Sequence, residues 1–386
     1  MKLQNDWIGF RYNMTNPFMK IHLPAHDITK LEALFTTKQK NMEAALLLQQ
    51  FWLLSQSKRI AKQPTTLTKH AYAELIESTL VKGLGAAMDP IFREHYFLPG
   101  IHSIDPKHYL HNPYVKTIKP THRSLGKWSL AYERYQPFQG FPVNDVFVIP
   151  EKGFQEITPI GFSAQSFEFL TIQEKQTTWM SLTPFEIETM QPIIDQVHGH
   201  VLTFGLGLGY FAFMAALKPS VKKVTIIERD THVISLFRTH LLPQFPYPEK
   251  IVIQPMDAIR DLTLLAKQDT YDHLFVDIYH DAVDGIQAYL SIKPQEYIFN
   301  QTTVHYWLEA SILSLLRRYV LIYLEEQLNH ANTADYQTIH SFDDAMLQYL
   351  HQQCYSTTLT SYDALTKILS VEGLKNLLQK PFTLPR

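Results

Sequence analysis

The 386-residue sequence contains a single cysteine, Cys354, and no excess of either charge. One cysteine cannot form an internal disulfide, so the sequence favours a reducing compartment, the cytoplasm. Lysine and arginine total 35 against 37 aspartate and glutamate residues, which gives a formal net charge of -2. Binding to nucleic acid or to an anionic membrane usually needs a basic surface, so neither is expected as a partner.

Long apolar runs are also missing. The opening residues, MKLQNDWIGFRYN, hold no apolar stretch of the kind found in a signal peptide. The apolar stretches 44–54 and 310–324 are interrupted by glutamine or arginine, and neither reaches about 20 residues, the length of a membrane-spanning helix. Hydrophobic residues make up 45% and charged residues 19% of the chain, which is typical of a globular protein with a sizeable core.

Two units of different type are expected in the first half of the chain. Residues 1–123 are predicted to be a mainly helical N-terminal domain, because apolar residues recur every three or four positions from about Asp27 to Leu84. We interpret this domain as a cap or as a contact in a homodimer. Residues 124–182 hold short β-branched and aromatic runs between Pro, Gly and Asn, which predicts a small antiparallel β unit.

Strand and helix patterns alternate from residue 183 to residue 330. A helix is predicted to begin after Thr183, with Glu186 placed for a capping box. Five apolar strands follow, with helices between them; the last helix is expected over VHYWLEASILSLL and the last strand over YVLIYLE. Such strands predict an α/β architecture, a parallel-rich sheet with helices on both faces. Residues 331–386 are predicted to be a helical C-terminal tail.

The turn after the first strand of this region, VLTFGLGLGY, contains Gly205, Gly207 and Gly209. In an open α/β sheet this turn is the usual place for a ligand, and glycine allows the ligand to approach the backbone. A dinucleotide fingerprint, G-x-G-x-x-G, would require glycine where Tyr210 stands, which disfavours a nicotinamide cofactor.

The observed G-x-G-x-G spacing resembles the first motif of class I S-adenosylmethionine-dependent methyltransferases, a superfamily with a Rossmann-like fold. The resemblance implies that the three glycines approach the methionine and ribose part of S-adenosyl-L-methionine. It also implies that Glu228, followed by Arg229, binds the ribose hydroxyls. Asp257 and Ala258 would contact the adenine, and Asp277 would lie beside the reacting end of the cofactor.

The resemblance spans about residues 167–324 and is nearest to the spermidine synthase-like branch. Each acidic residue also has a structural interpretation: Glu228 as a solvated strand end, Asp257 as a helix cap and Asp277 as a capped turn. Their occurrence in register after successive strands favours the cofactor interpretation.

The loop after the fourth strand, YDHLFVDIYHD, holds the candidate catalytic residues. Methyl transfer needs mainly alignment, with a base only where the nucleophile starts protonated. His280 is the candidate base, and Asp277 and Tyr279 are the other candidates; the alternative is a simple polar loop. Trp179 is interpreted as a core aromatic residue. His198-Gly199-His200 lacks a third ligand at a suitable spacing, so no metal site is predicted.

Three functions are weighed. The first is an S-adenosylmethionine-dependent methyltransferase acting on an unidentified small-molecule acceptor. The second is a spermidine synthase-like aminopropyl or aminoalkyl transferase. It is less favoured because the Tyr-His-Glu and Asp-Ser-Ser-Asp motifs of polyamine synthases are replaced here by Thr183-Pro184-Phe185-Glu186 and by Asp277-Ile278-Tyr279-His280-Asp281. The third is a nucleoside-binding or scaffold protein without turnover. Nucleic-acid methylation is disfavoured because the Asn/Asp-Pro-Pro-Tyr signature is absent.

Overall fold

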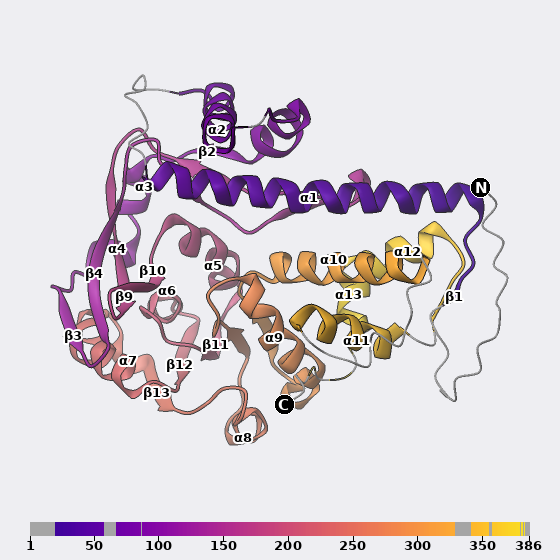
Figure 1. The fold of residues 1–386 in the computed structure, drawn as a ribbon. Helices are drawn as coiled ribbons and strands as arrows, with labels where there is room; N and C mark the ends of the chain where they lie inside the picture. Colours follow the sequence, from indigo (N-terminus) through magenta and orange to yellow (C-terminus); the bar gives the residue numbers. More distant parts are fainter. Residues whose placement is uncertain are drawn as a thin grey trace.

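The computed structural model describes residues 20–57, 67–85, 87–328, 341–354 and 357–378, together with 380 and 382. It contains a parallel sheet of five strands in the order β13-β12-β11-β14-β15. Figure 1 labels three of them, β11, β12 and β13. The strand of this sheet that comes first along the chain, β11, is thus central, and the strand order reverses beside it. In chain order, the strands of the sheet are β11 (Gly199–Phe204), β12 (Val221–Glu228), β13 (Ile251–Pro255), β14 (His273–Val276) and β15 (Thr303–Tyr306).

The centres of β11, β12 and β14 are buried throughout, as expected for a sheet that is covered by helices on both faces. The protein is therefore α/β, as predicted. The helices associated with the sheet are α5 (Pro184–Gln196), α6 (Tyr210–Leu217), α7 (Thr231–Leu236), α8 (Leu262–Gln268), α9 (Ala282–Ile292) and α10 (Glu309–Leu328). The predicted capping box at the start of α5 is confirmed, with Thr183 as N-cap and Glu186 as its partner.

The fifth strand lies elsewhere than predicted. The segment YVLIYLE, predicted as a strand, belongs to helix α10, and the strand is β15, at the start of the segment that was predicted as a helix. In α10 the residues Leu313, Leu316, Val320 and Leu324 are buried at steps of three and four, so the helix packs a continuous apolar face.

The antiparallel unit predicted for residues 124–182 is present. Its main sheet has the order β10-β9-β4-β3 and consists of β3 (Arg123–Leu125), β4 (Trp128–Tyr135), β9 (Phe167–Glu174) and β10 (Thr177–Ser181). The short helices α3 (Pro106–Leu110) and α4 (Pro113–Thr117) lie beside it (Figure 1). Two smaller sheets are formed by β2 (Ile101–Ser103), β5 (Phe141–Pro142) and β8 (Ile160–Phe162), and by β6 (Phe147–Ile149) and β7 (Gln155–Ile157).

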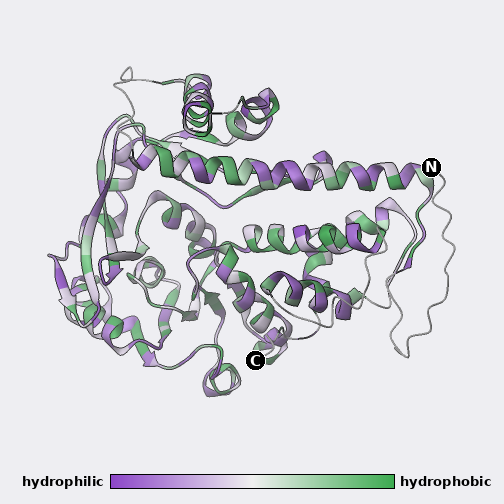
Figure 2. Ribbon diagram, viewed as in Figure 1, coloured by the Kyte–Doolittle hydropathy of each residue, from purple (hydrophilic) through white to green (hydrophobic). Residues whose placement is uncertain are grey.

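The N-terminal helices and the C-terminal helices meet along one side of the molecule. The long helix α1 (Ala25–Ser57) contacts α2 (Lys69–Leu84) on one side and α10 and α12 (Tyr362–Leu369) on the other (Figure 1). Hydrophobic and hydrophilic residues alternate along α1 (Figure 2), consistent with a helix packed on two sides. The other tail elements are α11 (Phe342–Cys354), α13 (Val371–Leu377) and β16 (Thr358–Leu359), which pairs in parallel with β1 (Lys20–Ile21). Among the helices of the described residues, none has the length and hydropathy required to cross a membrane.

Candidate active site

A cavity of about 660 Å³ lies at the carboxyl ends of the parallel strands. Its volume is in the range of small-molecule sites, and its place is where open α/β sheets bind ligands. The ends of all five strands contribute to it, four of them with residues singled out in the sequence, and the antiparallel sheet forms the facing wall. The lining residues include Gly205, Leu206, Gly207, Glu228, Arg229, Asp257, Ala258, Asp277, Tyr279 and His280 from the strand ends, and Trp128, Trp179 and Met180 from the facing wall.

The glycine loop divides into residues that line the cavity and one that does not. Gly205 has φ 97°, and a Cβ there would lie 1.9 Å from the carbonyl oxygen of Asp277, so only glycine fits this close approach of two strand ends. Gly207 also lines the cavity, packed against the Met180 side chain. Gly209 was expected to approach the cofactor, but it lies outside the cavity lining. It caps α6 with φ 74°, and the Phe237 ring covers its open side.

Glu228 is held at the carboxyl end of β12 by backbone donors. Its Oε1 accepts a hydrogen bond from the Asp230 amide at 2.8 Å, and its Oε2 faces the Leu206 amide at 3.4 Å. A carboxylate has about four acceptor positions, so the half-buried Glu228 keeps capacity for two hydroxyl donors in the cavity. The neighbouring Arg229 is exposed at the rim, with a guanidinium nitrogen 3.8 Å from Asp257 Oδ2.

Asp257 and Ala258 line the cavity beyond the end of β13. Asp257 Oδ1 accepts hydrogen bonds from the amides of Ile259 and Arg260, at 3.1 and 2.9 Å, so the side chain caps the turn that precedes α8. The N-cap of α8 itself is Asp261, so the structure contradicts the helix-cap interpretation of Asp257. The second oxygen of Asp257 remains on the cavity side, near Arg229. Ala258 is buried, and its small side chain leaves room beside the backbone.

A pair of carboxyl groups lies in the cavity, and one member was not predicted. Glu186 is buried and accepts hydrogen bonds from the Thr183 amide at 2.9 Å and from the Thr183 hydroxyl. Burial raises the pKa of Glu186 to about 7, against the opposing effect of these two donors. Burial and the nearby Glu186 carboxyl raise the pKa of Asp277 to about 8. Within the described residues the Asp277 side chain has no hydrogen-bond partner, so it faces the cavity unpaired.

The candidate base His280 has an orienting carboxylate. Its Nδ1 lies 2.8 Å from Asp284 Oδ2, and Asp284 also accepts the His280 amide. The ring packs edge-on to the Trp179 indole, with centroids 4.0 Å apart. This arrangement fixes the imidazole: Nδ1 donates to Asp284, and Nε2 is the nitrogen that does not bond to Asp284.

Tyr279 lines the cavity but does not offer its hydroxyl to it. The buried hydroxyl donates to the Trp307 carbonyl at 2.5 Å, and the ring stacks on that indole. The hydroxyl of Tyr279, a candidate catalytic group in the sequence, therefore has a structural role in this structure. Trp179 was interpreted as a core residue, which is wrong: the side chain is 44% exposed in the cavity wall, edge-on to Trp128.

Acidic residues outnumber basic ones in the cavity lining, a property that individual motifs did not reveal. Six carboxyl-bearing residues face two basic ones, Lys127 and Arg229, and Lys127 forms an ion pair with Glu174 at 2.6 Å. The acidic residues of the lining are Glu186, Glu228, Asp230, Asp257, Asp277 and Asp284. The cavity therefore attracts cations.

The two histidines of the HGH segment lie at the opposite, amino-terminal edge of the sheet. The His198 ring contacts His273 with centroids 4.5 Å apart, and His200 Nε2 lies 2.9 Å from the Thr225 hydroxyl. In the part of the chain that the structure describes, no group of three or more metal-ligating side chains is arranged to hold an ion.

Comparison with known proteins gives no family for this chain: no model of a known protein family matches it, and no curated protein matches its sequence. Its function is therefore inferred from the cavity and the residues that line it.

Proposed function

We propose that the protein is an S-adenosylmethionine-dependent methyltransferase of Rossmann-like fold that acts on a small molecule. The observation that carries the proposal is the meeting of four strand ends in one cavity. Gly205 and Gly207, Glu228, Asp257 with Ala258, and Asp277 line it together. The strand order, which reverses beside β11, supports the same fold.

The residues of the cavity suit an adenosyl group. The free acceptor positions of Glu228 match two ribose hydroxyls, and the open oxygen of Asp257 would accept from the adenine amino group. Ala258 leaves space for the flat base, and Gly205 and Gly207 leave space for the chain between ribose and sulfur. When bound, S-adenosylmethionine supplies a methyl group on a cationic sulfonium. Asp277 would stabilise the positive end of such a ligand.

His280 is placed to remove a proton from an acceptor. Asp284 holds the imidazole by Nδ1, so that Nε2 would serve as the acceptor of the proton. The indole of Trp179 limits the movement of the ring. The remaining task of the cavity is to align the acceptor with the methyl carbon and to exclude water.

The carboxyl pair favours a second candidate, aminopropyl or aminoalkyl transfer. Glu186 and Asp277 together would hold a cationic amine, and decarboxylated S-adenosylmethionine lacks the carboxylate that this acidic cavity repels. The two candidates differ in which form of the cofactor they prefer.

Calorimetric titration tests both candidates. The ligands are S-adenosylmethionine, S-adenosylhomocysteine, decarboxylated S-adenosylmethionine and NAD, with Glu228→Ala as the site variant and Glu249→Ala, an exposed position outside the cavity, as the control. Loss of two hydrogen bonds to a charged group, about 3 kcal/mol, should weaken nucleoside binding by about 100-fold in Glu228→Ala only.

The pattern of affinities decides between the candidates. Binding of S-adenosylmethionine and S-adenosylhomocysteine without binding of NAD supports methyl transfer. Tighter binding of decarboxylated S-adenosylmethionine than of S-adenosylmethionine supports aminopropyl transfer. Equal affinities in the wild type and Glu228→Ala would refute the assignment of the site.

A further inference from the structure

A second cavity, of about 370 Å³, lies outside the candidate active site. It opens between the short helices α3 and α4 and one face of the β4–β9 strand pair, on the left side of Figure 1. We call it the α4 groove. Its lining is rich in aromatic and aliphatic side chains, and the members used below are Tyr109, Leu110, Tyr114, Lys119, Tyr132 and Arg134.

The face of β4 that lines the groove is buried at the start of the strand and exposed near its end. Alternate residues of β4 share a face: Trp128 and Leu130 are buried towards the parallel sheet, whereas Tyr132 is 43% exposed. From α3, Leu110 is 45% exposed on the opposite side of the groove. Two large apolar surfaces thus face a common space, and a flat apolar ligand would cover both.

The charge of the α4 groove is opposite to that of the candidate active site. Arg134 pairs with Glu168 across the strands at 2.5 Å, which leaves Lys119 as the additional charge of the lining. Within the described residues the Lys119 ammonium group has no ion-pair partner, and its backbone amide is fixed by the Gln244 side chain at 2.8 Å. An anionic group on the ligand would therefore complement this end of the groove.

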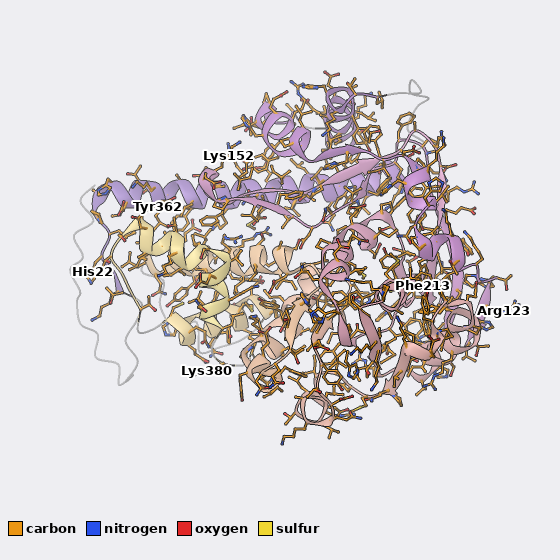
Figure 3. The ribbon with its side chains drawn as sticks, turned by 180° about the vertical axis from the view of Figure 1, so that it is seen from behind. His22, Arg123, Lys152, Phe213, Tyr362 and Lys380 are labelled. Carbon is orange, nitrogen blue, oxygen red and sulfur yellow. The ribbon has the colours of Figure 1, made fainter. Side chains whose placement is uncertain are left out.

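The floor of the groove is fixed before any ligand arrives. The Tyr109 hydroxyl donates to the Leu182 carbonyl at 2.7 Å, and the Tyr114 hydroxyl donates to the Leu208 carbonyl, within the glycine loop, at 2.5 Å. The Tyr114 ring also packs edge-on to Phe213, with centroids 5.1 Å apart. Figure 3 shows Phe213 inside the molecule, inward of the sheet edge that carries Arg123. A fixed floor reduces the entropy cost of binding.

We propose that the α4 groove is a binding site for a small aromatic carboxylate, with the ring between Tyr132 and Leu110 and the carboxylate at Lys119. The proposal does not depend on the proposed function, because the groove and the candidate active site have separate linings.

The test uses 4-phenylbutyrate as the probe and 4-phenylbutylamine as a cation of similar shape, titrated into the full-length protein and followed by ligand-observed NMR. Lys119→Glu reverses the charge at an exposed position just beyond α4, and Lys116→Glu, at an exposed position within α4 but outside the groove lining, is the matched control. Leu110→Trp fills the groove from an exposed position. Asp277→Asn reports on binding in the other cavity.

The wild type and Lys116→Glu should bind the acid more tightly than the amine. Lys119→Glu should weaken binding of the acid by about tenfold, the value of a charge-assisted hydrogen bond, and Leu110→Trp should abolish it. Asp277→Asn should have no effect. The proposal is overturned if the acid does not bind, if the amine binds more tightly, or if Lys119→Glu and wild type bind the acid equally.

Discussion

Replacing Asp277 by asparagine should stabilise the ligand-free protein, and more so at alkaline pH. The pKa of the Asp277 carboxyl group is about 8 in the folded protein, against 3.8 in an unfolded chain. Between these values the folded state keeps a proton that the unfolded state releases. The contribution of the group is therefore fully present below about pH 4 and is lost as the pH rises through 8.

The magnitude follows from the size of the pKa change. About four pH units at about 1.4 kcal/mol each set an upper limit of about 6 kcal/mol at alkaline pH. Water at the mouth of the cavity and proton sharing with Glu186 reduce this value, so we expect a gain of about 2 kcal/mol for Asp277→Asn at pH 8.5. Asparagine is nearly the same size as aspartate, so packing should change little.

Urea unfolding of the wild type and of Asp277→Asn at pH 5.0 and pH 8.5 measures the effect. Glu249→Gln, which removes an exposed carboxylate outside the cavity, is the control and should change the unfolding free energy little at either pH. The reasoning is refuted if Asp277→Asn gives the same change in free energy at both pH values, or if it destabilises the protein at pH 8.5.

Three further predictions concern other parts of the fold. His273 is buried, and burial together with the neighbouring His305 lowers its pKa to about 4; stability should therefore fall as the pH drops from about 6.5 to 4, and His273→Asn should flatten this part of an unfolding profile. Gly209→Ala should lower the unfolding free energy by about 2 kcal/mol without altering nucleoside affinity by calorimetry, because the new Cβ would meet the Phe237 ring at a left-handed position. Trp179 is the exposed indole of the cavity wall, whereas Trp128 and Trp307 are buried there, so ligand binding should change tryptophan fluorescence in the wild type and less in Trp179→Phe.

The strand ends could be predicted because their signals are local. Each of Glu228, Asp257 and Asp277 directly follows an apolar run, and parallel strands bring their carboxyl ends to one edge. The glycines of the loop were recognised for the same reason. Sequence spacing does not show which way a glycine faces, however, and Gly209 faces Phe237 rather than the cavity.

Trp179 was misplaced because its position depends on an irregularity in strand pairing. The register of β10 against β9 shifts between Thr178 and Met180, so Trp179 sits at a bulge. A bulge re-aims the side chains around it, and here it turns the indole into the cavity wall while Met180 reaches Gly207. A pattern of alternating residues cannot reveal such a shift.

The fifth strand was missed because β15 is short and mixed in polarity. Its residues, TVHY, combine a threonine and a histidine with two apolar residues, and they directly precede a long apolar segment. The β-branched and aromatic residues of that segment favoured a strand locally. Burial at helical spacing in α10 outweighs this preference, because the helix packs against α1, α9 and α11.

Glu186 was recognised as part of a capping box but not as a cavity residue. A cap needs only an exposed glutamate, whereas this one is buried near Asp277, and its carboxyl group hinders ionisation of Asp277. Within the described residues, no basic side chain neutralises Asp277. Such an uncompensated pair is typical of a site that is completed by its ligand.

A cationic ligand should therefore stabilise the protein through Asp277 itself. It would favour the ionised carboxylate and release the proton that the free protein holds, so binding should strengthen as the pH rises towards 8 and should be accompanied by proton release. Titrating decarboxylated S-adenosylmethionine at pH 7.5 in two buffers of different ionisation enthalpy measures the number of protons released. Asp277→Asn should bind more weakly and release fewer. If both proteins release the same number, the ligand does not ionise Asp277, and the carboxyl pair has another role.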